Sequence, residues 1–142
     1  MNELAPGWSA LLALQRATHA TLHVLAAELA DLNLTASEIN VLANLADGHS
    51  LSISELGRAA GTRPTTLTSV LDRLERRGHI TRGPHPSDRR GVQVELTRSG
   101  RQAAAAIRHA IAGIEERALG PLPAEATTAL RTALQAFTEV SG

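Results

Sequence analysis

The chain has 142 residues, of which 43% are hydrophobic, and its fourteen arginines balance fourteen acidic residues. This length suits a single domain, residues 1–142, with a hydrophobic core of its own. The absence of cysteine excludes disulfides, thiolate metal sites and thiol-based redox sensing within the chain. No stretch has the pattern of a signal peptide or the length of a membrane span, so we expect a cytoplasmic protein without a membrane partner.

Positive charge is concentrated in one third of the chain. The segment from Arg58 to Arg101 contains ten arginines and four acidic residues, a net charge of +6. The remainder contains four arginines and ten acidic residues, a net charge of −6. Such an asymmetry within a neutral chain is typical of a nucleic-acid contact surface.

Residues 8–32 are predicted to form one long helix, because their leucines recur at helical spacing on one face. These are Leu11, Leu14, Leu22, Leu25, Leu29 and Leu32. His19 and His23 lie one turn apart on the polar face and could hold a metal together, but no third ligand is apparent nearby. An incidental histidine pair is the favoured interpretation, and we expect no metal.

Two capping boxes follow, Thr35 with Glu38 and Ser52 with Glu55. They predict one helix that ends at about residue 46 and a second, shorter helix that ends near Gly61. Each box is preceded by an apolar residue that can staple the start of its helix.

A third helix is predicted from Pro64 to Arg77, because proline suits a first helical turn and the apolar residues that follow form one stripe. That stripe is Leu67, Val70, Leu71 and Leu74, and the other face shows Thr65, Thr66, Ser69, Asp72, Arg73 and Arg76. Two short helices joined by a glycine turn, the second displaying hydroxyls and arginines, indicate a helix-turn-helix. An ordinary surface helix with a charged face is the alternative. Asp72 and Glu75 are expected to pair with Arg76 and its neighbours on the helix surface.

A β-hairpin is predicted next. A strand begins at residues 79–82, and residues 92–96 alternate with period two, as a half-buried strand should. The tip between them carries Asp88, Arg89 and Arg90. An arginine at the end of a stiff ribbon can enter a narrow minor groove, whereas a flexible solvated loop is the alternative.

Two further helices complete the chain. Thr97 can cap the first, which should extend to about Leu119, and Pro121 and Pro123 separate it from the second. Their aliphatic stripes, like that of residues 8–32, could complete a monomeric bundle. Dimerisation is the favoured interpretation, because two-fold partners would present two recognition helices to a palindromic site.

The central motifs, in order, are Leu71 to Leu74, Arg77-Gly78, Asp88 to Arg90, and Leu96-Thr97 with Gly100. This ordered set resembles the MarR family of bacterial winged-helix regulators, and the likeness covers about residues 8–140. The resemblance implies a mainly α fold with a small β-hairpin wing. A winged helix-turn-helix at residues 35–97 would be flanked by dimerisation helices at residues 8–32 and 98–140.

The same resemblance implies a homodimer that binds a pseudo-palindromic operator in double-stranded DNA. The residues that would face the major groove or its phosphates are Arg63, Thr65, Thr66, Thr68, Ser69 and Arg73. Arg90 would enter the minor groove with Asp88 orienting it, and Arg89 would meet phosphate. Many members are repressors released by small anionic or phenolic ligands. No pocket residues are assigned, although Arg16, His19 and His23 are the polar groups best placed to meet an anion.

We therefore expect a dimeric, DNA-binding transcriptional repressor that needs no cofactor. The alternative is a winged-helix interaction module that uses its basic face for an acidic protein. An enzyme is not expected, because the sequence has no nucleophile and base at a recognisable spacing, no glycine-rich phosphate loop and no paired carboxylates.

Overall fold

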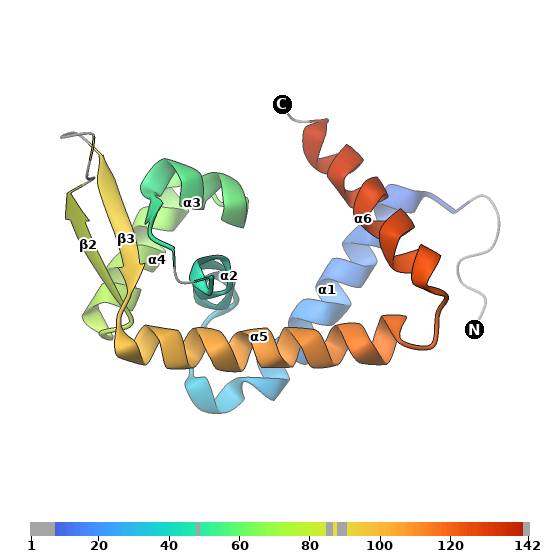
Figure 1. Ribbon diagram of the computed structural model, residues 1–142, viewed down its shortest axis with the longest axis horizontal. Coiled ribbons are helices and arrows are strands. Elements are labelled where there is room, and N and C mark those ends of the chain that lie inside the picture. The colour runs from blue at the N-terminus through green and yellow to red at the C-terminus, as the bar shows by residue number, and fades with distance from the viewer. Residues whose placement is uncertain (1–7, 48, 85–86, 88–90, 141–142) are drawn as a thin grey trace. The chain divides into compact units, whose positions relative to one another are not determined.

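The computed structural model describes residues 8–47, 49–84, 87 and 91–140 and is mostly helical (Figure 1). Its elements in chain order are α1 (Ala10–Glu28), the short 3-10 helix η1 (Ala30–Leu32), α2 (Ala36–Leu45), β1 (Leu51–Ser52), α3 (Ile53–Ala60), α4 (Pro64–Arg76), β2 (Ile80–Pro84), β3 (Val92–Leu96), α5 (Arg98–Leu119) and α6 (Ala124–Glu139). By contacts the chain divides into two units, Met1–Ala110 and Ile111–Gly142, with α5 running from one into the other. In the described part of the chain, no helix is long and apolar enough to span a membrane.

Both predicted capping boxes are present. The Thr35 amide donates to Glu38 Oε1 at 2.8 Å, and the Glu38 amide donates to Thr35 Oγ1 at 3.2 Å. Ser52 and Glu55 make the same reciprocal pair at 2.9 and 3.1 Å. The turn between α3 and α4 is made by Gly61, whose φ of 64° lies in the left-handed region that glycine adopts without strain. The predicted helix-turn-helix is therefore confirmed.

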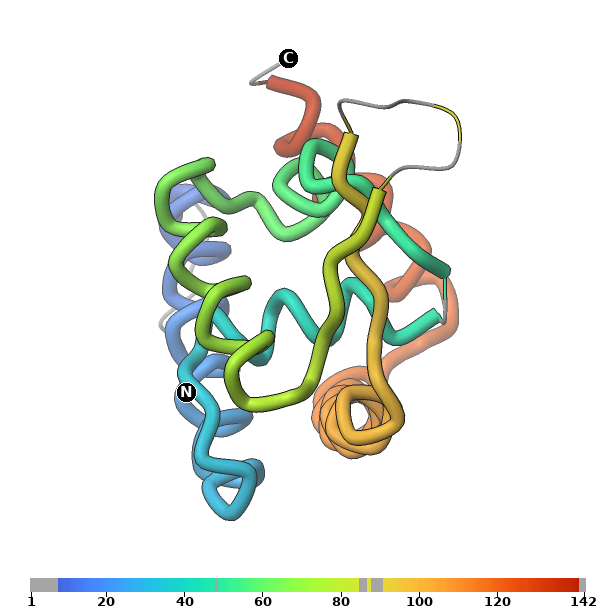
Figure 2. Tube along the Cα trace, turned by 90° about the vertical axis from the view of Figure 1, so that its left-hand side faces the viewer, coloured from blue at the N-terminus to red at the C-terminus, as the bar shows by residue number. Residues whose placement is uncertain are grey.

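A small antiparallel sheet packs beside this helix-turn-helix, with the strand order β1-β3-β2. The predicted hairpin is confirmed by the pairing of β2 with β3 (Figure 2). In its register Arg82 lies opposite Val94. The third strand, β1, was not predicted. It has only two residues, paired with Val94 and Gln93, so it is too short to show an alternating pattern and exists because β3 offers it a partner.

The core is aliphatic. Its fully buried side chains are Leu42, Leu45, Leu56, Leu67, Leu71, Leu74, Ile80, Ile107, Val41, Val70 and Val94. They come from α2, α3, α4, both long strands and the first half of α5. The apolar stripe of α4 thus faces inward and leaves its polar face to solvent.

The prediction of one helix across residues 8–32 is wrong at its end. The α-helix stops at Glu28, and η1 follows. Leu29 has left helical geometry, with φ −106° and ψ 19°, and Asn33 ends η1 in the left-handed region at φ 56°. The sequence pattern misses this break because a 3-10 turn repeats every three residues, so Leu29 and Leu32 keep the spacing that an α-helix would give them.

Candidate nucleic-acid interface

The outer face of α4 carries the side chains that were predicted to read DNA. Pro64 occupies the first helical turn, and Arg63 precedes it as the N-cap in an extended conformation. The exposed residues here are Arg63, Thr65, Thr66, Thr68 and Ser69, with Arg73 two turns beyond the helix start and partly buried. The structure therefore brings six of the nine predicted contact residues together on one helix. Asp88, Arg89 and Arg90 lie outside the described residues.

The hydroxyls on this face differ in their availability. Thr68 Oγ1 donates to the Pro64 carbonyl at 3.0 Å, and Ser69 Oγ accepts a hydrogen bond from Arg73 Nη1 at 3.0 Å. Thr65 and Thr66 make no side-chain hydrogen bond to any described residue. Because both residues are exposed, their hydroxyls are available as donors and acceptors, and their methyl groups are available for apolar contacts.

Arg82 joins the wing to α4. From β2, its Nη2 donates to Asp72 Oδ1 at 2.8 Å and to Glu75 Oε1 at 2.7 Å, both on α4. The hydrogen bond from Arg82 lowers the pKa of Glu75, and the two carboxylates raise the pKa of Arg82. The expected pairing of Asp72 and Glu75 with Arg76 is wrong, because Arg76 Nε instead donates to the Asp72 backbone carbonyl at 3.3 Å. The sequence cannot show this, since the partner arrives from a different element.

The turn after α4 is held from two sides. Gly78 has a φ of 80°, and its carbonyl accepts a hydrogen bond from Thr97 Oγ1 at the start of α5. Ser99 Oγ lies 2.9 Å from His79 Nδ1. Burial lowers the pKa of His79, and the positive charge of Arg77 lowers it further. The end of α4 is thereby attached to α5.

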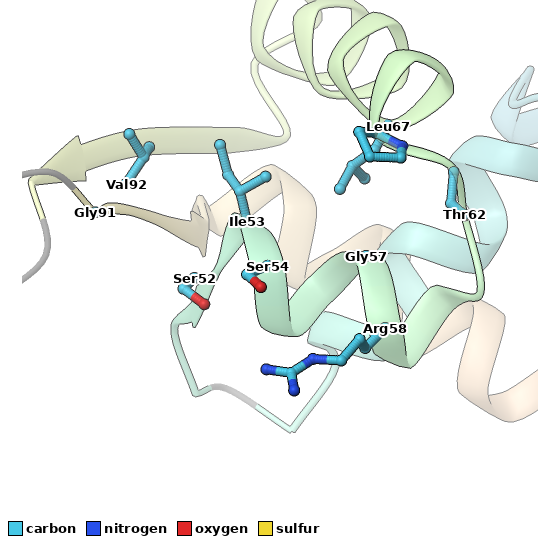
Figure 3. Close-up of a pocket in the computed structure, with 10 residues that line it drawn as sticks. Ser52, Ile53, Ser54, Gly57, Arg58, Thr62, Leu67, Gly91 and Val92 are labelled. Atoms are coloured by element: carbon cyan, nitrogen blue, oxygen red, sulfur yellow. The ribbon is translucent and has the colours of Figure 1, made fainter. Parts of the chain in front are cut away.

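A hollow of about 760 Å³ separates the start of α4 from the wing (Figure 3). It is lined by Ser52, Ile53, Ser54, Gly57, Arg58, Thr62, Pro64, Leu67, Gly91 and Val92. Figure 3 shows Ile53 between Val92 and Leu67 on the apolar side, with the exposed Arg58 on α3 as the positively charged group. Arg58 was counted in the basic segment but was not predicted as a contact. Its place at the edge of this hollow depends on the tertiary fold.

Arg16, His19 and His23 are exposed on α1. The Arg16 guanidinium lies 4.5 Å from the centre of the Trp8 ring, a cation–π contact. Within the described ranges, no group of three or more His, Cys, Asp or Glu side chains comes together as a metal site.

The fold and this charged face agree with the comparisons with known proteins. A family model described as the MarR family matches residues 34–92, which include α2, α3, α4 and β2. The multiple antibiotic resistance protein MarR of Escherichia coli K12 is 36% identical over 72 residues, which are 51% of this chain and 50% of that protein. Residues 34–92 are therefore similar to the MarR family.

Solved structures match the chain over almost its full length. A mutant of Escherichia coli MarR complexed with operator DNA superposes with a TM-score of 0.74 at 25% identity, covering 96% of each chain. NadR in complex with 4-hydroxyphenylacetate superposes with a TM-score of 0.84 over 99% of each chain, and at 23% identity it shows the shared fold alone. In sequence, the chain spans about half the length of the curated relatives it matches first.

Proposed function

We propose that this chain is a sequence-specific DNA-binding transcriptional regulator of the MarR family, a repressor that binds a pseudo-palindromic operator as a homodimer. The observation that carries the proposal is the outer face of α4. It combines available hydroxyls with arginines on a helix whose opposite face is buried, inside a segment of net charge +6. A rigid helix with these side chains suits the major groove, where hydroxyls accept and donate to base edges and arginines meet phosphates.

In this proposal the start of α4 enters the major groove. Thr65 and Thr66 contact base edges and thymine methyl groups, because their hydroxyls have no partner among the described residues. Arg63 and Arg58 flank that end of the helix and meet the sugar-phosphate backbone, which can pass along the hollow beside the wing. Since Arg82 joins the wing to α4, the two elements approach DNA as one body.

The wing tip is proposed to reach the adjacent minor groove. Arg90 would enter that groove with Asp88 orienting it, and Arg89 would meet phosphate. We expect Arg90→Ala to weaken operator binding by about 1–3 kcal/mol, the scale of one good contact. A gel-shift titration in which this variant keeps the affinity of the unmodified protein would contradict the placement.

A second copy of the chain is proposed to cover the terminal helices. Neither α1 nor α6 has a buried residue in the single chain. Large apolar side chains are exposed on both, namely Leu11, Leu12, Leu22 and Val24 on α1 and Leu130 and Phe137 on α6. Apolar surface of this extent is stabilised when a partner removes it from water. A two-fold dimer would also place two α4 helices on successive half-sites of DNA.

Repression is proposed to end when a small anionic or phenolic effector binds. NadR, which shares this fold, was solved in complex with such a compound, 4-hydroxyphenylacetate. In this chain Arg16, His19 and His23 offer exposed cationic or hydrogen-bonding groups on α1. Isothermal titration with 4-hydroxyphenylacetate, followed by operator binding with and without it, tests this part of the proposal.

Footprinting on the intergenic DNA upstream of the coding gene tests the proposal as a whole. A two-fold dimer should protect two half-sites whose centres lie about 34–36 Å apart, one turn of B-DNA, or a multiple of that distance. Two chains should bind each duplex, as measured by light scattering of the complex. Protection of a single half-site, or no protection at protein concentrations that saturate binding, would contradict the dimeric regulator.

A further inference from the structure

Glu38 has contacts beyond its capping role. It is 3% exposed and is the one fully buried charged side chain among the described residues. Its Oε1 accepts the Thr35 amide at 2.8 Å, which completes the capping box. Its Oε2 faces α4, at 4.0 Å from Arg73 Nε and 3.9 Å from Arg77 Nη1. A carboxylate is costly to bury unless charges of opposite sign lie beside it, so these two arginines account for its burial.

The two arginines differ in what else holds them. Arg77 donates from Nη1 to the Asn33 carbonyl at 2.7 Å and from Nη2 to the Leu32 carbonyl at 3.1 Å, so its guanidinium is fixed to the end of η1. Arg73 donates from Nη1 to Ser69 Oγ, and its Nε is buried without a hydrogen-bond partner. Arg73 is therefore held by Ser69 and by the charge of Glu38, whereas Arg77 is held in addition by two backbone carbonyls.

We propose that Glu38 is a positioning residue that sets the specificity of the α4 surface by holding Arg73 over Ser69 and away from phosphates. This inference rests on the proposed DNA-binding function. An arginine released from a carboxylate can reach the DNA backbone, where a contact adds affinity for every sequence alike. Held by Glu38, the same arginine orients Ser69 on the face that reads bases. Glu38 thus raises the ratio of operator affinity to affinity for other DNA sequences, and it lowers the affinity for DNA of any sequence.

The variant Glu38→Gln tests this, because glutamine can keep the capping box while it removes the negative charge. Arg73 is 41% exposed and can regain water, so the fold should survive the change. We expect binding to a scrambled duplex to strengthen several-fold. The slope of log affinity against log salt should steepen by about 0.9, the value of one added phosphate contact. The ratio of operator to scrambled affinity should fall.

Asp31→Asn is the matched control. Asp31 is exposed on η1, makes no ion pair with a described residue, and its change adds the same charge to the chain as Glu38→Gln. Its salt slope and its affinity ratio should match those of the unmodified protein. If Asp31→Asn steepens the slope as much as Glu38→Gln does, the effect is one of net charge, and the inference fails.

The variant Arg73→Ala shows whether Arg73 positions Ser69 or contacts a phosphate, even if Glu38→Gln does not fold. If Arg73 positions Ser69 and contacts no phosphate, Arg73→Ala should lower operator affinity and leave the slope of log affinity against log salt unchanged. A slope that becomes shallower by about 0.9 in Arg73→Ala would identify a phosphate contact and overturn the inference. If the unmodified protein binds no DNA specifically, the proposed function fails. Specific binding with an unchanged slope in Glu38→Gln refutes this inference alone.

Discussion

Gly100→Ala should destabilise the protein, because at this residue α5 lies so close to the His79 backbone that a side chain does not fit. A Cβ atom at Gly100 would lie 1.9 Å from the His79 carbonyl oxygen and 2.9 Å from its carbon. Ordinary contact begins at 3.4 Å, so the backbone must move by about 1.5 Å. That movement would break the bond from the Thr97 amide to the same oxygen, now 3.0 Å long. Overpacking costs about 1–3 kcal/mol and a lost hydrogen bond about 1 kcal/mol, so we expect a loss of about 2–4 kcal/mol.

Urea denaturation followed by circular dichroism measures this loss, and Gly113→Ala on the same helix is its control. At Gly113 nothing lies within 4 Å of an added Cβ. Alanine should there stabilise the helix by about 0.5–1 kcal/mol, because it has the higher helix propensity. The same substitution should therefore have opposite signs at two positions of α5. A Gly100→Ala variant as stable as the unmodified protein would refute the close approach.

Three further outcomes are expected. Arg82→Ala should weaken operator binding without loss of helix content. Arg82 lowers the pKa of Glu75, so the ion pair between them stabilises the fold above about pH 4.5, the ordinary pKa of a glutamate. This stabilisation is lost as the pH falls through the lowered pKa of Glu75. Stability curves of the variant and the unmodified protein should thus converge in acid. Thr65→Ala should cost about 1–3 kcal/mol of discrimination between operator and mutated operator, and Thr68→Ala less, because the Thr68 hydroxyl already bonds within the helix. Phe137→Asp, on the exposed stripe of α6, should shift the protein from dimer to monomer in analytical ultracentrifugation, and an unchanged sedimentation coefficient would contradict the proposed interface.

Short-range sequence patterns predicted the helix-turn-helix well. The Thr35 and Ser52 capping boxes, Gly61 in the left-handed turn and Pro64 in the first turn of α4 each depend on residues within four positions of one another. The resemblance also named Gly100 in the motif that leads into α5, and the structure gives its physical reason, the approach to the His79 backbone. Features determined by neighbours in sequence can be predicted from the sequence.

Features determined by partners distant in sequence were missed. Glu38 was recognised as a capping residue, but its second oxygen faces arginines 35 and 39 positions away. Arg82 was one of many basic residues until the fold placed it against Asp72 and Glu75. No spacing rule connects a strand residue with a carboxylate on the preceding helix. The exposed polar face of α4 was thus predictable, whereas the ion pairs that orient it were not.

Fluorescence anisotropy with the duplex upstream of the coding gene tests the central claim most directly. The purified protein would be titrated into that duplex and into a scrambled duplex of equal composition, each at two salt concentrations. The proposal predicts binding that is markedly tighter for the natural sequence and that weakens steeply as salt rises, because phosphate contacts release counterions. Equal affinity for the two duplexes, or no binding at low salt, would contradict a sequence-specific regulator and would leave the basic face to a different partner.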